Sequence, residues 1–113
     1  MAYGLTQSPL CVAATPSYFN TGTSIAALNI TGDITVEAWV KFTSMPSDRA
    51  DIVAKPAGAA YGSYALELLK SGANYDLRAV ASLSGTPSLI VAKSSWNPST
   101  GVWYHVAYTQ SGD

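Results

Sequence analysis

The sequence predicts an all-β protein in which short strands stack as an antiparallel sandwich. Apolar and polar residues alternate along several short segments, which is the period of a strand with one buried face. Turn-forming residues interrupt the chain at intervals of about 8–12 residues, as they do in sandwiches and barrels. No segment sustains the i, i+3, i+4, i+7 apolar spacing of an amphipathic helix.

Eight segments are expected to be strands, and no linker or repeat separates them. They cover residues 10–14, 18–20, 34–42, 51–55, 64–69, 75–82, 88–93 and 103–109. Clusters rich in Pro, Gly, Ser and Asn lie between them, for example MPSD at 45–48 and NPSTG at 97–101. These residue types set or tolerate the backbone dihedrals of turns. The even spacing favours a single sandwich domain over residues 1–113.

The segment 34–42 shows the alternation most clearly. One set of its side chains is apolar and predicts a core face: Ile34, Val36, Ala38, Val40 and Phe42. The other set carries a carboxylate, an indole and an ammonium group: Thr35, Glu37, Trp39 and Lys41. Segments 64–69 and 103–109 have large side chains on both faces. Loops or a neighbouring subunit are therefore expected to cover the outer faces of the sheets.

Composition excludes several classes of protein. Charged residues make up 12% of the 113 residues, against about 25% in an average soluble domain. The net charge is −1 and the cations are scattered, which argues against nucleic-acid binding. No apolar run approaches the ~20 residues of a membrane-spanning helix, so membrane insertion is not expected. A surface with so little charge suits an extracellular module, or one that packs against copies of itself.

The N-terminal residues MAYGLTQSPL lack the basic start and long apolar stretch of a signal peptide. Either a signal has been removed or the protein leaves the cell by another route, as a virion component released by lysis does. The expected location is extracellular, on the cell surface or on a virion.

Cys11 and His105 are the single cysteine and the single histidine. Cys11 is expected to be a buried, inert thiol, with a disulfide between chains as the alternative. A Cys11–His105 catalytic dyad lacks any local signature. No metal-ligand spacing is present, so no metal or cofactor is expected from the residues.

Five stretches carry a family resemblance: SIAALNITGDITVEAWVKF, DIVAK, SYALELL, DLRAVAS and GVWYHVAYTQSGD. They resemble the laminin-G-like domains of the concanavalin A-like lectin/glucanase superfamily, over roughly residues 10–113. The resemblance implies a jelly-roll sandwich of two antiparallel sheets. It also implies binding of carbohydrate, protein or calcium, or a role in adhesion and packing.

Two departures from the family pattern matter. Where relatives carry an acidic FDG-x-x-D-like turn, this chain reads CVAATPSYF, which weakens the implied calcium site. Relatives also continue past the last segment into a strand like LYVDG, whereas this chain stops at Asp113. Three outcomes are open: a cut-down product, a natural minimal sandwich, or a partner chain that supplies the strand. We expect the open edge to be satisfied between subunits, which gives a homo-oligomer or a larger assembly.

Catalytic residues are not expected. Glycan-cleaving relatives resemble one another in an E-x-D-x-E strand, which places two carboxylates on one face. The two glutamates here are Glu37 and Glu67, and neither has a second acid two or four positions on.

Two sets of residues are candidates for ligand binding. Trp96 and Asn97, in the SSWNPSTG loop, are candidates for stacking on a sugar and gripping its hydroxyl groups, together with Tyr61 in another loop. The alternative is that Trp96 plugs the end of the sandwich or docks a neighbouring chain. The second set is a cross-strand pair of Glu37 and His105 on a polar, ligand-facing surface.

Trp39 and Trp103 are expected to fill the sandwich, or the layer beneath a covering loop, because large aromatic side chains are usually buried. The function predicted is a non-catalytic recognition module that binds a glycan or a surface protein. The alternative is a structural or adhesion protein that acts by self-association, such as a virion decoration or a filament subunit. A hydrolase function is supported only by analogy with other proteins of this fold.

Overall fold

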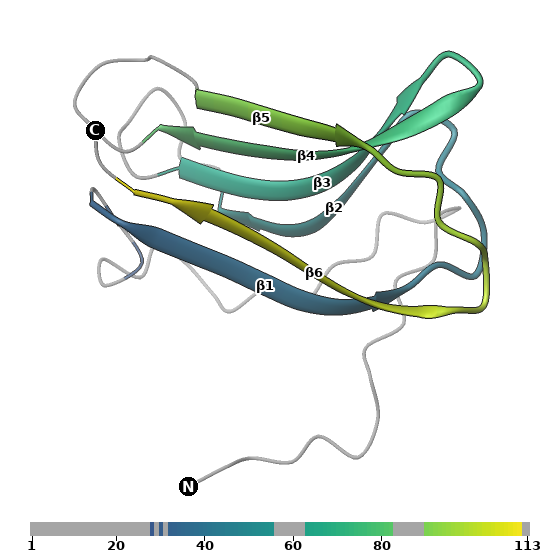
Figure 1. Ribbon diagram of the computed structural model, residues 1–113, viewed down its shortest axis with the longest axis horizontal. Coiled ribbons are helices and arrows are strands. Elements are labelled where there is room, and N and C mark those ends of the chain that lie inside the picture. Colours follow the sequence, from purple (N-terminus) through teal and green to yellow (C-terminus); the bar gives the residue numbers. More distant parts are fainter. Residues whose placement is uncertain (1–27, 29, 31, 56–62, 83–89, 112–113) are drawn as a thin grey trace, which may run out of the picture.

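The computed structural model describes residues 28, 30, 32–55, 63–82 and 90–111. This part of the chain forms six strands: β1 (Ile34–Lys41), β2 (Arg49–Lys55), β3 (Ser63–Ser71), β4 (Asn74–Ser82), β5 (Ile90–Ser95) and β6 (Trp103–Gln110). They pair antiparallel in a two-stranded sheet, β1-β6, and a four-stranded sheet, β2-β3-β4-β5. Figure 1 shows the two sheets as separate layers. The predicted all-β, antiparallel sandwich is therefore confirmed.

The six strands match the last six expected segments, with ends that differ by a few residues. The expected strands at 10–14 and 18–20, and Cys11, lie outside the described residues. No helix in the described part of the chain has the length and apolarity of a membrane span.

The β1-β6 ladder joins segments far apart in the sequence. Its register runs without interruption from Ile34 opposite Gln110 to Lys41 opposite Trp103. Because side chains alternate across a strand, this register places Val36 and Val106 on one side of the sheet and Trp39 and His105 on the other. The first side packs against the four-stranded sheet, since Val36 and Val106 belong to one buried cluster with Leu66 of β3.

Two local features shape the four-stranded sheet. Gly72 and Ala73 connect β3 to β4, and Gly72 has φ of 64°. Type II′ hairpin turns require a positive φ at this first central position, which glycine adopts without a Cβ clash. Between Asp51 and Val53 the register of β2 against β3 shifts, as in a β-bulge. The bulge lets the consecutive residues Ile52 and Val53 both pack against the core.

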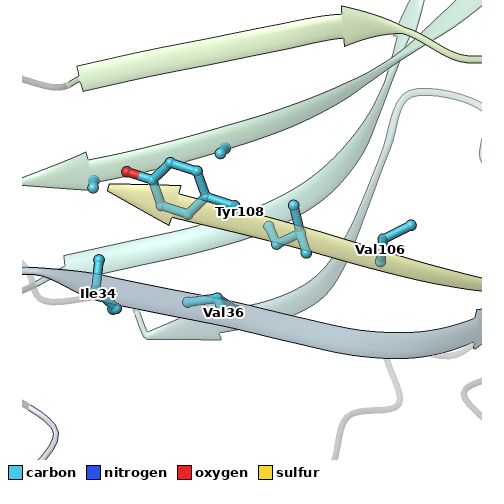
Figure 2. Close-up of a cluster of buried hydrophobic side chains, with 7 residues drawn as sticks. Ile34, Val36, Val106 and Tyr108 are labelled. Atoms are coloured by element: carbon cyan, nitrogen blue, oxygen red, sulfur yellow. The ribbon is translucent and has the colours of Figure 1, made fainter. Parts of the chain in front are cut away.

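The hydrophobic core lies between the sheets. Figure 2 shows Ile34 and Val36 from β1 together with Val106 and Tyr108 from β6. The buried cluster consists of Ile34, Val36, Leu66, Ala79, Ala81, Val106 and Tyr108. Leu66 is 1% exposed. Burial of these side chains is the main term that holds the two layers together.

Tyr108 links the core to the pH dependence of stability. Its hydroxyl donates a hydrogen bond to Gln110 Oε1 at 3.2 Å, and burial raises the pKa of Tyr108 above its ordinary value. The folded state therefore holds the phenolic proton more tightly than the unfolded state. The stability linked to this proton is complete below the unfolded pKa of about 10, and it is lost as pH rises through the folded pKa.

We expect the free energy of unfolding to fall less steeply in Tyr108→Phe than in the wild type at alkaline pH. Urea unfolding between about pH 8 and pH 11 measures this difference. If the unfolding free energy fell equally steeply with pH in the two proteins, this part of the pH dependence would not come from Tyr108, since every other tyrosine is common to both.

Candidate functional site

The outer face of the β1-β6 sheet is the candidate site. This face, called the outer β1–β6 face below, consists of Thr35, Glu37, Trp39, Lys41, Trp103, His105, Ala107 and Thr109. All eight residues are exposed, while the alternate residues on the same strands are buried or half-buried. The period-2 alternation of the two segments produces this separation directly.

Two tryptophans lie exposed on this face. The exposed fraction is 68% for Trp39 and 46% for Trp103. The prediction that they fill the sandwich or lie beneath a covering loop is therefore wrong. Val36, Val40 and Val106 take the inward positions of the two strands, so the indoles point to solvent. The outer face of this sheet is thus exposed in the described part of the chain, and its coverage by a neighbouring subunit stays a prediction.

Glu37 and His105 contact each other across the two strands. Glu37 Oε2 lies 3.3 Å from His105 Nε2, and both side chains are exposed to solvent. His105 is directly opposite Trp39 in the register. The two rings have centroids 5.3 Å apart and are tilted by 45°. A carboxylate, an imidazole and an indole thus form one continuous group at the middle of the face.

The end of the outer β1–β6 face that contains Lys41 and Trp103 is cationic. Lys41 is opposite Trp103, and its Nζ lies 5.1 Å from the centroid of that indole. This distance is typical of a cation–π contact. The face is therefore polarised, with Glu37 on one side of Trp39 and Lys41 on the other. Its two formal charges cancel.

Trp96 and Asn97, the first pair of candidates, hold one end of the sandwich together. The Trp96 ring is half-buried and packs edge-to-face near Phe42 and Tyr104, with centroids 6.1 and 5.1 Å away. Asn97 Oδ1 accepts a hydrogen bond from the backbone N–H of Tyr75. These contacts correspond to the alternative in which Trp96 plugs the sandwich end, and they do not give it an exposed platform. Tyr61 lies outside the described residues.

The family comparison agrees with this architecture. A laminin-G-type family model, described as the concanavalin A-like lectin/glucanases superfamily, matches residues 14–113. The chain belongs to this superfamily. Neither a curated protein nor a solved structure matches the chain.

Within this lectin/glucanase-like domain, most of the described carboxylates outside the β1–β6 face are engaged with cations. One row of charged residues crosses the four-stranded sheet in register: Asp51, Glu67, Arg78 and Lys93. Glu67 is 3% exposed. It accepts a hydrogen bond from Arg78 Nε, and Arg49 Nε lies 3.6 Å from its second oxygen. Asp51 pairs with Arg49, and Asp76 with Lys93.

Metal binding has no candidate in the described part of the domain. No group of three or more His, Cys, Asp or Glu side chains there is arranged to hold an ion.

Sequence reasoning grouped Glu37, Trp39 and Lys41 on one side of the 34–42 segment and suggested the Glu37–His105 pair, but it expected Trp39 and Trp103 to be buried. The signal was available, because alternation along residues 34–42 places Trp39 on the same side as Glu37 and Lys41. The general tendency of tryptophan to be buried was given more weight than that alternation.

Proposed function

We propose that this lectin/glucanase-superfamily domain is a non-catalytic recognition module that binds a glycan through the outer β1–β6 face. The observation that carries the proposal is the exposed Trp39 ring beside the Glu37–His105 pair. An exposed indole offers a flat apolar surface on which the C–H face of a sugar ring stacks. The neighbouring carboxylate accepts hydrogen bonds from sugar hydroxyl groups, and the imidazole either donates or accepts.

The proposal of a non-catalytic role is supported by the contacts that the acidic side chains already make with basic residues. Glycoside hydrolysis needs two carboxyl groups free to act on either side of the scissile bond. On the outer β1–β6 face Glu37 is the one acid, and on the four-stranded sheet Glu67 is held by two arginines. Recognition of glycans fits the proposed location of the protein outside the cell, on the cell surface or on a virion.

Self-association is the second candidate, and one observation favours it. Glu37 and Lys41 flank Trp39 on the same face, so a two-fold axis through Trp39 would set each glutamate against a lysine of the second copy. Size argues against a stable dimer through this face alone. Two strands of eight residues cover roughly 270 Å² of sheet, well below the ~800 Å² per partner of a standard interface. Association through a sheet edge stays a prediction.

We expect Trp39→Ala to weaken glycan binding by about tenfold or more, because stacking contributes beyond the buried area. Screening the wild type on a glycan array, followed by calorimetry with the ligand found, measures the change. Trp96→Phe is the matched control, since it alters a tryptophan that packs against the core, and it should bind as the wild type does.

Light scattering on the same proteins separates the two candidates. If no arrayed glycan binds and the wild type forms a dimer that the Trp39→Ala substitution dissociates, the proposed function becomes self-association instead of glycan recognition. Unchanged glycan affinity in Trp39→Ala would remove the outer β1–β6 face as the binding site. The stability of Trp39→Ala should stay within about 0.5 kcal/mol of the wild type, so lost binding would not reflect unfolding.

A further inference from the structure

The two exposed indoles of the outer β1–β6 face are not equivalent. Trp39 is 68% exposed and lies beside the imidazole of His105. Trp103 is 46% exposed, and the ammonium group of Lys41 lies over its ring. A ligand can therefore stack on Trp39 without displacing a lysine. Stacking on the side of the Trp103 ring that Lys41 covers requires Lys41 to move away.

The register sets how far apart the backbones of these two tryptophans are. Trp39 is opposite His105 and Lys41 is opposite Trp103, so the two tryptophans occupy diagonal positions on neighbouring strands. Diagonal neighbours have Cα atoms about 7–8 Å apart. One pyranose ring covers one indole, so contact with both tryptophans requires at least two linked sugars. A ligand that uses the whole face therefore lies along this diagonal.

The charges on the outer β1–β6 face narrow the chemical class of the ligand. Glu37 and Lys41 carry opposite charges on the two sides of Trp39, so the face has no net attraction for a polyanion. An uncharged oligosaccharide suits a face whose opposite charges balance. Sugars whose hydroxyl groups are all equatorial expose an apolar C–H face on both sides of the ring. Successive rings of a β-1,4-linked chain of such sugars therefore present C–H faces to both indoles.

We infer that the outer β1–β6 face contains two stacking subsites, a primary one at Trp39 and a secondary one at Trp103, for a neutral β-1,4-linked oligosaccharide. This inference rests on the proposed glycan-binding function. Trp39, with Glu37 and His105, holds the first sugar and fixes its orientation. Trp103 contacts the next sugar and contributes only when the ligand is long enough to reach it.

The test compares ligand length with the loss of each tryptophan. The probes are N-acetylglucosamine and its β-1,4-linked tetramer, and glucose and its β-1,4-linked tetramer, titrated by NMR into the full chain. In at least one series we expect the wild type to bind the tetramer about tenfold more tightly than the monosaccharide. Trp103→Ala should remove this gain and leave monosaccharide affinity unchanged. Trp39→Ala should weaken both, and Trp96→Phe should change neither.

The outcomes separate this inference from the proposed function. Equal affinity for monosaccharide and tetramer, or a length-dependent gain that survives in Trp103→Ala, overturns the two subsites and leaves glycan binding standing. Array binding to other glycans, with neither tetramer bound, overturns the assigned ligand class. If neither tetramer nor any arrayed glycan binds, both the subsites and the proposed function are overturned.

Discussion

Replacing Arg78 by methionine is expected to lower the free energy of unfolding by about 3 kcal/mol. Arg78 is directly opposite Glu67 in the β3–β4 ladder, and its Nε donates a hydrogen bond to the carboxylate. Glu67 is 3% exposed, so the substitution leaves a buried charge with only Arg49 nearby, at 3.6 Å. Removing one partner of a buried pair costs about 3–5 kcal/mol. The low end applies because Arg78 is 27% exposed and Arg49 remains.

Urea unfolding followed by circular dichroism measures this loss, and two variants serve as controls. Lys93→Met removes the pair with Asp76, whose atoms are 3.7 Å apart and whose lysine is 65% exposed. That change should cost less than Arg78→Met, because the Asp76 side chain is 13% exposed and its contact with the solvated lysine is long. The double variant Glu67→Leu/Arg78→Met removes both charges and should recover most of the stability. A loss below about 1 kcal/mol in Arg78→Met would show that Glu67 does not depend on this partner.

Leu66→Ala is expected to cost about 3 kcal/mol, within the 2–5 kcal/mol range of buried leucines. Leu66 is 1% exposed and belongs to the cluster between the two sheets. The truncation removes apolar contacts and leaves a cavity that the flanking strands only partly close. Since domains are stable by about 5–15 kcal/mol in total, the loss is a large fraction of the fold's stability.

Leu28→Ala is the matched control for this core substitution. Leu28 is 37% exposed, so the same chemical change there should cost less than about 1 kcal/mol. Thermal and urea unfolding of the two variants measure the comparison. Similar losses at both positions would contradict the placement of Leu66 at the centre of the sandwich.

Strand positions were predictable from the sequence, but strand partners were not. Alternation along residues 34–42 and 103–109 identified β1 and β6 and, for residues 34–42, the inward side chains. It could not show that the two pair with each other over a separation of more than sixty residues. A period of two assigns faces to a strand and does not indicate its neighbour. The bulge at Ile52 was missed for the same reason, since it depends on the register against β3.

The candidate site was only partly predictable. The Glu37–His105 contact was one of the hypotheses drawn from the sequence, and the structure places these side chains 3.3 Å apart. Trp39 was expected to be buried and is exposed, whereas the half-buried Trp96 corresponds to the alternative that it plugs the sandwich end. Trp39 is in a strand and exposed, whereas Trp96 is in a loop and packs against Phe42 and Tyr104. Location in a strand or a loop does not decide exposure, because exposure depends on what the opposite layer covers.

The sequence by itself determined the class of fold, the approximate positions of the strands and the apolar inward side of the 34–42 strand. These properties are local, since alternation and turn residues act over a few positions. Only the tertiary structure decided which strands pair, that Glu67 is buried between two arginines, and that Trp39, His105 and Glu37 meet on one exposed surface. Each of these depends on residues distant in the chain, whose approach is set by the packing of two whole sheets.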